Sequence, residues 1–259
     1  MNRELVRAEP WHTLSRWTSA RIAMGRAGVS TPTQALLEFN LDHAQARDAI
    51  YTPFDSDVLQ REFQLAGFNT LAVRSCAQSR TEYLRRPDLG AALDPRCIAT
   101  LTQSEAPKPG RLSVVIADGL SALAPAHHAL EVLLSLRQGL GDWQLDDIVV
   151  ASQARVALAD EIGEQRGAEA VLMLIGERPG LKSPDSLGAY LTYSPRKGRM
   201  DSERNCVSNI HRSGLSYSAA TSKLLHLLAQ ARALGTTGIA LKEDSTGPLI
   251  HGSREQTGE

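Results

Sequence analysis

Two carboxylates in this sequence directly follow apolar segments of the kind that form buried strands. Asp118 follows LSVVIA at 112–117, and Glu177 follows VLMLIG at 171–176, within the run GERPG. A glycine beside each carboxylate would let a ligand approach the backbone closely. Two acidic groups so placed suit a ligand rich in hydrogen-bond donors, such as amides or an ammonium group, better than a phosphate. On this pattern alone, ordinary polar loops are an equal alternative.

No other residues have the spacing of a catalytic or metal centre. His127 and His128 are adjacent, and neighbours on a helix point about 100° apart, so we do not expect them to share a tetrahedral ion. His43 lies on an apolar helical face, which favours a hydrogen-bonded core or interface histidine. Cys206 has no base identifiable from sequence, and a free cysteine is usually a small buried apolar side chain. We therefore predict neither a catalytic residue nor a metal ligand.

Composition excludes several classes of function. The 259 residues include 28 Lys and Arg against 29 Asp and Glu, a balance that offers no electrostatic attraction for nucleic acid or an anionic membrane. No segment approaches the roughly 20 apolar residues of a membrane helix, and the first residues lack the apolar core of a secretory signal. Three widely spaced cysteines indicate free thiols in a reducing compartment. No nucleotide-binding glycine motif follows a strand. We expect a globular cytosolic protein.

The elements that must position the two carboxylates change in type near residue 69. Before it the pattern is helical, with helices expected over 11–24, from Ser30-Thr31-Pro32 onward, and over 55–66 from Asp55 or Ser56. The second of these helices has an apolar face formed by Leu36, Phe39, His43, Ala46 and Ile50.

After residue 69 short strands alternate with helices. Strands are expected at 70–73, 112–117, 148–150, 171–175, 187–193, 205–210 and 238–241. A short helix is expected before Pro87, and another over 156–166. Two further helices are expected from their apolar faces, one formed by Leu120, Leu123, His127, Leu130 and Leu134 and the other by Leu224, Leu227, Leu228, Ala231 and Leu234. This alternation is typical of an α/β domain with a parallel sheet. Ligands bind where parallel strands end, so Asp118 and Glu177 should share one edge. We divide the chain into a helical region at 1–68, an α/β domain at 69–242 and a polar tail at 243–259.

Five segments in register resemble the small-subunit family of ethanolamine ammonia-lyases. They are residues 20–50, YLRRPDLG at 83–90, VVIADGLSA at 114–122, LIGERPGLKSPDSLGAY at 174–190 and RNCVSNIH at 204–211. The resemblance runs in order from about residue 18 to about residue 241. Each motif alone is weak, but five in register, GERPG and RNCVSNI among them, are specific.

The resemblance implies a Rossmann-like, mostly parallel sheet with flanking helices, preceded by a helical N-terminal region. It also implies a barrel-shaped large subunit that holds ethanolamine and converts it to acetaldehyde and ammonia, with adenosylcobalamin between the two subunits and no activity in this chain alone. The family's cobalamin-contacting positions fall on Val156, Glu177 and Cys206. Glu177 would accept hydrogen bonds from corrin amides, Val156 would offer apolar contact, and Cys206 a small polarizable surface. Asp118 is added from its expected position alone.

Several expectations qualify this resemblance. There is no D-x-H-x-x-G motif, so no histidine is marked to replace the cofactor's own base. About seventeen residues precede the matching region, which leaves packaging in a bacterial microcompartment open beside plain cytoplasm. Trp11 and Trp17 would either dock on the large subunit or be buried within this chain. Two other functions remain: a self-sufficient hydrolase or transferase with Asp118 and Glu177 as an acid–base pair, and a purely structural subunit.

Overall fold

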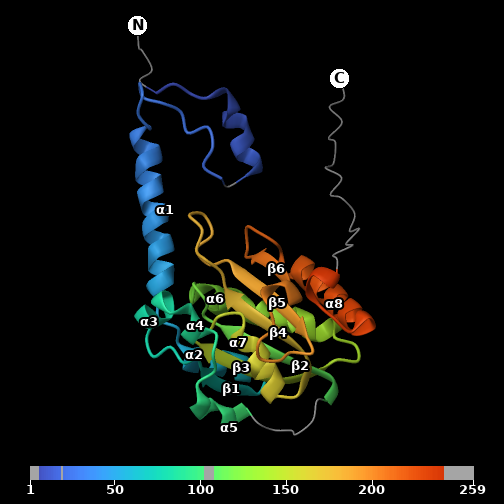
Figure 1. The fold of residues 1–259 in the computed structure, drawn as a ribbon. Helices are drawn as coiled ribbons and strands as arrows, with labels where there is room; N and C mark the ends of the chain where they lie inside the picture. Colours follow the sequence, from blue (N-terminus) through green and yellow to red (C-terminus); the bar gives the residue numbers. More distant parts are fainter. Residues whose placement is uncertain (1–5, 19, 102–107, 242–259) are drawn as a thin grey trace, which may run out of the picture.

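The protein contains one six-stranded sheet with helices on both faces (Figure 1). The computed structural model describes residues 6–18, 20–101 and 108–241. The strand order is β1-β3-β2-β4-β5-β6; the strands are β1 (Thr70–Arg74), β2 (Lys108–Ala117), β3 (Gln144–Ser152), β4 (Ala168–Gly176), β5 (Leu187–Tyr193) and β6 (Asn205–Ile210). The first four are parallel, and β5 and β6 add antiparallel pairs. This confirms the predicted α/β class with a mostly parallel sheet.

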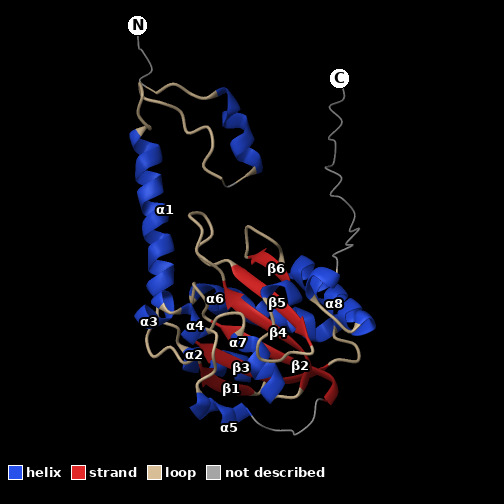
Figure 2. Cartoon of the chain, in the orientation of Figure 1, coloured by secondary structure: helices blue, strands red, loops and turns tan. Residues whose placement is uncertain are grey.

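The central strands β2, β3 and β4 are apolar on both sides because helices cover both faces of the sheet there (Figure 2). Val114 and Ile116 of β2 face one side, Val115 and Ala117 the other, and all four are fully buried. The first side packs against α2 (Ser56–Leu65), α6 (Leu123–Gly139) and α8 (Tyr217–Leu234). The second packs against α5 (Ile98–Leu101) and α7 (Leu158–Gln165). Other short elements are α3 (Arg80–Arg85), α4 (Pro87–Gly90), η2 (Pro95–Cys97) and η3 (Asp201–Glu203).

The prediction of a seventh strand at 238–241 is wrong. The segment is the 3-10 helix η4 (Gly238–Ala240), and it begins at a glycine with φ +83°. The Asn205 side chain accepts from the Gly238 N–H and donates to the Leu241 carbonyl. The Asn205 side chain thus forms hydrogen bonds with backbone groups that a strand would have used to pair with β6.

The N-terminal region differs from the prediction in three respects. The helix expected over 11–24 is a 3-10 helix, η1 (Pro10–Trp17), which ends at Trp17 and buries no residue. The next helix, α1 (Thr33–Tyr51), has Pro32 at its N-cap and no side-chain cap, so the expected hydroxyl cap is absent. Its predicted apolar face is exposed at Leu36, Phe39 and His43, because most of α1 extends beyond the sheet (Figure 1). His43 is therefore not a core histidine.

Other helix predictions are confirmed in part. Asp55 caps α2 through a 2.9 Å hydrogen bond from the Val58 N–H, and Pro87 marks the end of α3 as expected. The predicted buried face of α6 is displaced by about one residue, because apolar residues surround most of this helix. The residues that α6 buries are Ala124, Pro125, His128, Ala129, Val132, Leu133 and Leu136. On α8 the predicted face is buried except for Leu234.

Candidate functional site

The two strand ends singled out from the sequence do lie at the same edge of the sheet. β2 and β4 are parallel neighbours, with Ala117 opposite Ile175, so both strands end at the same edge of the sheet. Their glycines have a role other than the one expected. A Cβ at Gly119 would lie 2.1 Å from the Gly176 carbonyl oxygen, and one at Gly176 would lie 2.0 Å from the Ser121 carbonyl oxygen. The glycines therefore let the two loops pack against each other.

Asp118 points into the protein and not towards a ligand. The residue is 1 % exposed; one carboxylate oxygen lies 3.1 Å from the Arg80 guanidinium, and the other accepts a 3.1 Å hydrogen bond from the Ala154 N–H. Burial raises the pKa of Asp118 to about 6, although Arg80 acts in the opposite direction. The expected Asp118 ligand contact and the acid–base pair with Glu177 are therefore not supported.

A cavity of about 420 Å³ opens at this edge, and we call it the edge cavity. Val156, Glu177 and Tyr190 line it together with Arg155 and Arg178. Two of the predicted cofactor-contacting residues, far apart in sequence, therefore share one cavity. The prediction of an acidic edge is wrong. Asp118 points away from the cavity, and the guanidinium groups of Arg155 and Arg178 line it together with the single carboxylate of Glu177.

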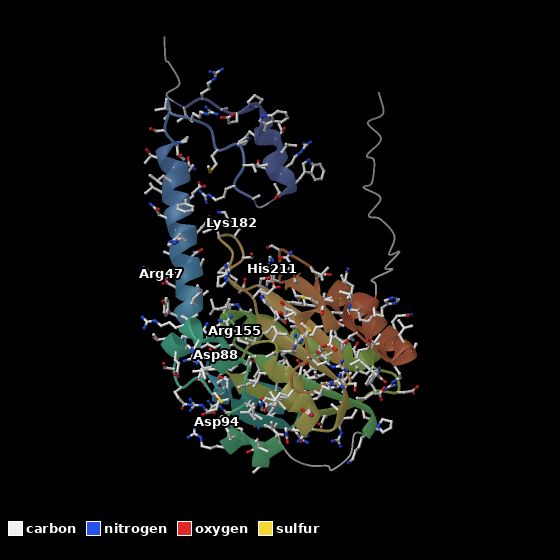
Figure 3. All side chains as sticks on the ribbon, in the orientation of Figure 1. Arg47, Asp88, Asp94, Arg155, Lys182 and His211 are labelled. Atoms are coloured by element: carbon white, nitrogen blue, oxygen red, sulfur yellow. The ribbon has the colours of Figure 1, made fainter. Side chains whose placement is uncertain are left out.

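Val156 lies in the turn that leads into α7, two residues before the helix begins. It is half-buried and packs against the apolar cluster under α7. The preceding Arg155 has its guanidinium 4.4 Å from the Tyr83 ring centroid, a cation–π distance, and its position is marked in Figure 3. Arg155 Nε is buried without a hydrogen-bond partner among the described residues. The turn thus presents one apolar and one cationic side chain to the edge cavity.

Glu177 is held firmly through one carboxylate oxygen. Its Oε2 accepts hydrogen bonds from the Ser186 hydroxyl at 2.5 Å and from the Asn209 N–H at 3.1 Å, and its own N–H donates to the Ser186 carbonyl. The other oxygen, Oε1, accepts no hydrogen bond from any described residue. It lies over Gly188, where an added Cβ would be 3.1 Å away. Glu177 is therefore fixed in place with one oxygen available as an acceptor.

Cys206 lies on β6 directly opposite Tyr190 of β5. The residue is exposed, so the expected burial is wrong. Partial burial of its sulfur raises the pKa of the thiol; a hydrogen bond with Tyr190 opposes this rise and the charge of Glu177 adds to it. A raised pKa disfavours the thiolate, which is the nucleophilic form of cysteine. Cys206 is therefore next to the edge cavity, with Tyr190 between them.

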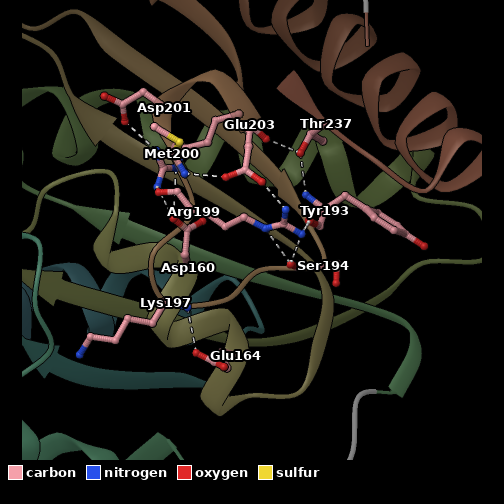
Figure 4. A network of polar contacts seen from close by, with 11 residues as sticks. Asp160, Glu164, Tyr193, Ser194, Lys197, Arg199, Met200, Asp201, Glu203 and Thr237 are labelled. Carbon is pink, nitrogen blue, oxygen red and sulfur yellow. Dashed lines mark hydrogen bonds and ion pairs between the residues drawn. The ribbon is translucent and has the colours of Figure 1, made fainter. Parts of the chain in front are cut away.

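An ionic network fixes the start of β6 (Figure 4). Arg204, immediately before β6, forms a buried ion pair with Asp160 of α7 and a 2.6 Å pair with Asp201. The Thr237 hydroxyl donates to the Glu203 carbonyl at 2.6 Å. Because the same segment contacts α7 and β6, the network holds the Cys206 strand relative to the turn that carries Val156.

Sequence reasoning missed one group entirely. The adjacent His127 and His128, expected to point apart, both contact one oxygen of Asp185, at 3.1 Å each. Asp185 lies in the loop at 177–186 that starts with Glu177. Nothing in the spacing of residues nearly sixty positions apart indicates this contact.

The family model for the ethanolamine ammonia-lyase light chain (EutC) matches residues 8–242. Among curated relatives, the ethanolamine ammonia-lyase small subunit of Ralstonia nicotianae is 47 % identical over 96 % of this chain and 94 % of its own length. That of Bradyrhizobium diazoefficiens is 49 % identical, with 95 % of each chain covered. That of Azotobacter vinelandii is 48 % identical, covering 94 % and 92 %. Every helix in the described part of the chain is too short or too polar to be a membrane span. The chain belongs to the ethanolamine ammonia-lyase light chain family.

Proposed function

We propose that this chain is the small subunit of an adenosylcobalamin-dependent ethanolamine ammonia-lyase, in which the edge cavity and the neighbouring surface of β5 and β6 hold the cobalamin against a large subunit. When bound, adenosylcobalamin supplies the radical that starts the conversion of ethanolamine to acetaldehyde and ammonia. This chain contributes binding, orientation and the exclusion of water, so it is inactive alone. Its relatives' names support a partner subunit.

The free oxygen of Glu177 is the observation that carries the proposal. The periphery of a corrin ring carries amide groups, which both donate and accept hydrogen bonds. Glu177 Oε1, fixed through Oε2, would accept from an amide N–H. Arg155, which lines the edge cavity, would donate to an amide carbonyl from its guanidinium group. A cavity with one carboxylate and two guanidinium groups therefore fits such a ligand better than a purely acidic edge would.

The surface beside the edge cavity supports the same ligand. α6 and α8 cover only one side of β5 and β6. On the other side, Tyr190 is half-buried and Cys206 and Ser208 are exposed. These side chains are uncharged and arise from neighbouring strands, so they form a flat support for a planar ring. Val156 would add apolar contact at its margin.

The N-terminal region supports docking on a large subunit. η1 and α1 extend away from the sheet (Figure 1), and they expose Trp11, Trp17, Leu36, Leu37 and Phe39. We call η1 and α1 together the N-terminal arm. Exposed apolar side chains on such a projecting segment indicate a protein interface. We propose that residues 1–68 make this contact, mainly through η1 and α1, and that 69–242 hold the cofactor. The free thiols support a cytoplasmic location, with or without a microcompartment.

Replacing Glu177 tests the proposal. In the complex reconstituted with the large subunit, Glu177→Gln should weaken adenosylcobalamin binding by about 1–3 kcal/mol, the usual cost of losing a hydrogen bond to a charged group. This corresponds to a rise of roughly 5- to 150-fold in Kd, measured by absorbance titration. Glu131→Gln, at an exposed position of α6, is the matched control and should leave Kd unchanged. Equal affinities for Glu177→Gln and the wild type would remove Glu177 as a contact.

A further inference from the structure

A polar cluster links α6 to the loop at 177–186, apart from the edge cavity. His127 Nδ1 and His128 Nε2 each lie 3.1 Å from Asp185 Oδ2, and the three atoms all lie within 4.8 Å of one another. His128 is buried, whereas the His127 side chain is 53 % exposed and that of Asp185 27 %. The cluster therefore has a buried side and a side open to solvent.

The two histidines converge because they use different ring nitrogens. Neighbours on a helix leave it about 100° apart. His127 contacts Asp185 through the nitrogen nearer its backbone, Nδ1, and His128 through the more distant Nε2. Their rings meet edge to face, at an interplanar angle of 77°. The ring geometry thus overcomes the divergence of the side chains.

The second ring nitrogen of His128 also has the kind of partner that metal-bound histidines have. His128 Nδ1 lies 2.8 Å from the Tyr217 hydroxyl. Metal-bound histidines commonly donate their second N–H to an oxygen, which fixes the tautomer and leaves the first nitrogen free to bind.

We propose that His127 Nδ1, His128 Nε2 and Asp185 Oδ2 form a site for a divalent transition-metal ion, with zinc as the best match. Zinc is bound by histidine nitrogen and carboxylate oxygen at about 2.0–2.2 Å in tetrahedral sites, which places neighbouring donors roughly 3.3 Å apart. Each histidine nitrogen lies 3.1 Å from Asp185 Oδ2, close to that separation, and the two nitrogens lie within 4.8 Å of each other. Three protein donors leave the fourth position to water on the exposed side.

The site would brace the loop that starts with Glu177. Asp185 is next to Ser186, which donates to Glu177 Oε2. The loop is also joined to the turn just before α6 by a hydrogen bond from the Ser121 hydroxyl to the Pro184 carbonyl. A bound ion would tie this loop to α6, and through Tyr217 to α8. The inference does not depend on the ligand of the edge cavity.

Metal titration of the full, untagged chain tests the site directly. After treatment with EDTA and dialysis, the wild type should bind one equivalent of Zn²⁺ in calorimetry. Co²⁺ should give the intense visible absorption of a four- or five-coordinate ion. The double variant His127→Gln/Asp185→Asn should lose both. His127 is exposed, and asparagine preserves an acceptor for His128, so this variant should fold, which circular dichroism checks.

Two further variants separate metal binding from an ordinary hydrogen-bonded cluster. Tyr217→Phe removes only the outer-shell oxygen and should weaken Zn²⁺ binding roughly 10- to 100-fold. His226→Gln removes an exposed histidine elsewhere on α8 and should have no effect. If the wild type and the double variant bind Zn²⁺ equally, or if Co²⁺ in the wild type remains six-coordinate with weak absorption, the cluster is hydrogen-bonded only and the proposal is wrong.

Discussion

Asp118 and Glu177 follow neighbouring strands in the same way, yet the protein uses them differently. Asp118 is buried, with both oxygens bonded to Arg80 and Ala154. Glu177 keeps one oxygen without a partner among the described residues and lines a cavity. The sequence pattern places both carboxylates at the correct edge. It could not reveal which one turns inward, because that depends on Arg80, which comes from α3 well before either strand.

The buried carboxyl of Asp118 should affect the pH dependence of stability. Its pKa in the folded protein is raised to about 6 from an ordinary value of 3.8. Between these values the folded state retains a proton that the unfolded state has lost. The contribution of this group to stability is therefore present below about pH 4 and is lost as the pH rises through 6.

We predict that the free energy of unfolding of the wild type minus that of Asp118→Asn falls by about 2 kcal/mol between pH 4 and pH 7. Urea-induced unfolding across this range measures the difference. Asp142→Asn, at an exposed turn, controls for the loss of one negative charge. A difference that stays constant with pH would show that Asp118 ionises like an exposed aspartate.

At the scale of elements, the buried strands are the most predictable part of the molecule. Continuous apolar runs such as the one around Val115 located the central strands correctly, and the strands expected at 187–193 and 205–210 are also present. The wrong predictions concern segments whose local sequence does not determine which face is buried or which secondary structure forms. Apolar residues surround most of α6, so periodicity could not select its buried face. The segment at 238–241 became a 3-10 helix because Asn205, distant in sequence, bonds its backbone groups.

The projecting N-terminal arm shows a different limit of sequence reasoning. An apolar face on α1 predicts burial, but it does not say against which chain. The described residues leave Trp11 66 % and Trp17 76 % exposed. The alternative that these side chains are buried against the described part of this chain is thereby wrong. Their burial on the large subunit remains a prediction.

We predict that Trp11→Ala/Trp17→Ala weakens binding to the large subunit by at least about 2 kcal/mol, as interface aromatic residues commonly do. The free energy of unfolding of the isolated chain should change by no more than about 0.5 kcal/mol, because neither side chain is buried in it. Calorimetry and urea unfolding measure the two quantities. Ile239→Ala, at an 81 % exposed position in η4, is the control. Unchanged affinity of the double variant would exclude η1 from the interface.

For the whole molecule, the sheet places three distant segments side by side. The turn with Val156 follows β3, Glu177 follows β4, and Cys206 lies on β6; the fold gathers them around Tyr190. The resemblance identified these three residues, whereas their common location depends on the strand order. Neither Arg155 nor Tyr190 could be selected from sequence, since each gains its place only when β3, β4 and β5 come together.

The structure of the complex with adenosylcobalamin, determined by electron cryomicroscopy, tests the central claim most directly. We predict that a corrin amide lies within about 3 Å of Glu177 Oε1, a hydrogen-bonding distance, with Val156 and Cys206 in van der Waals contact with the cofactor. The large subunit should cover the opposite side of the corrin. A corrin bound away from the edge cavity, with Glu177 exposed to solvent, would contradict the account.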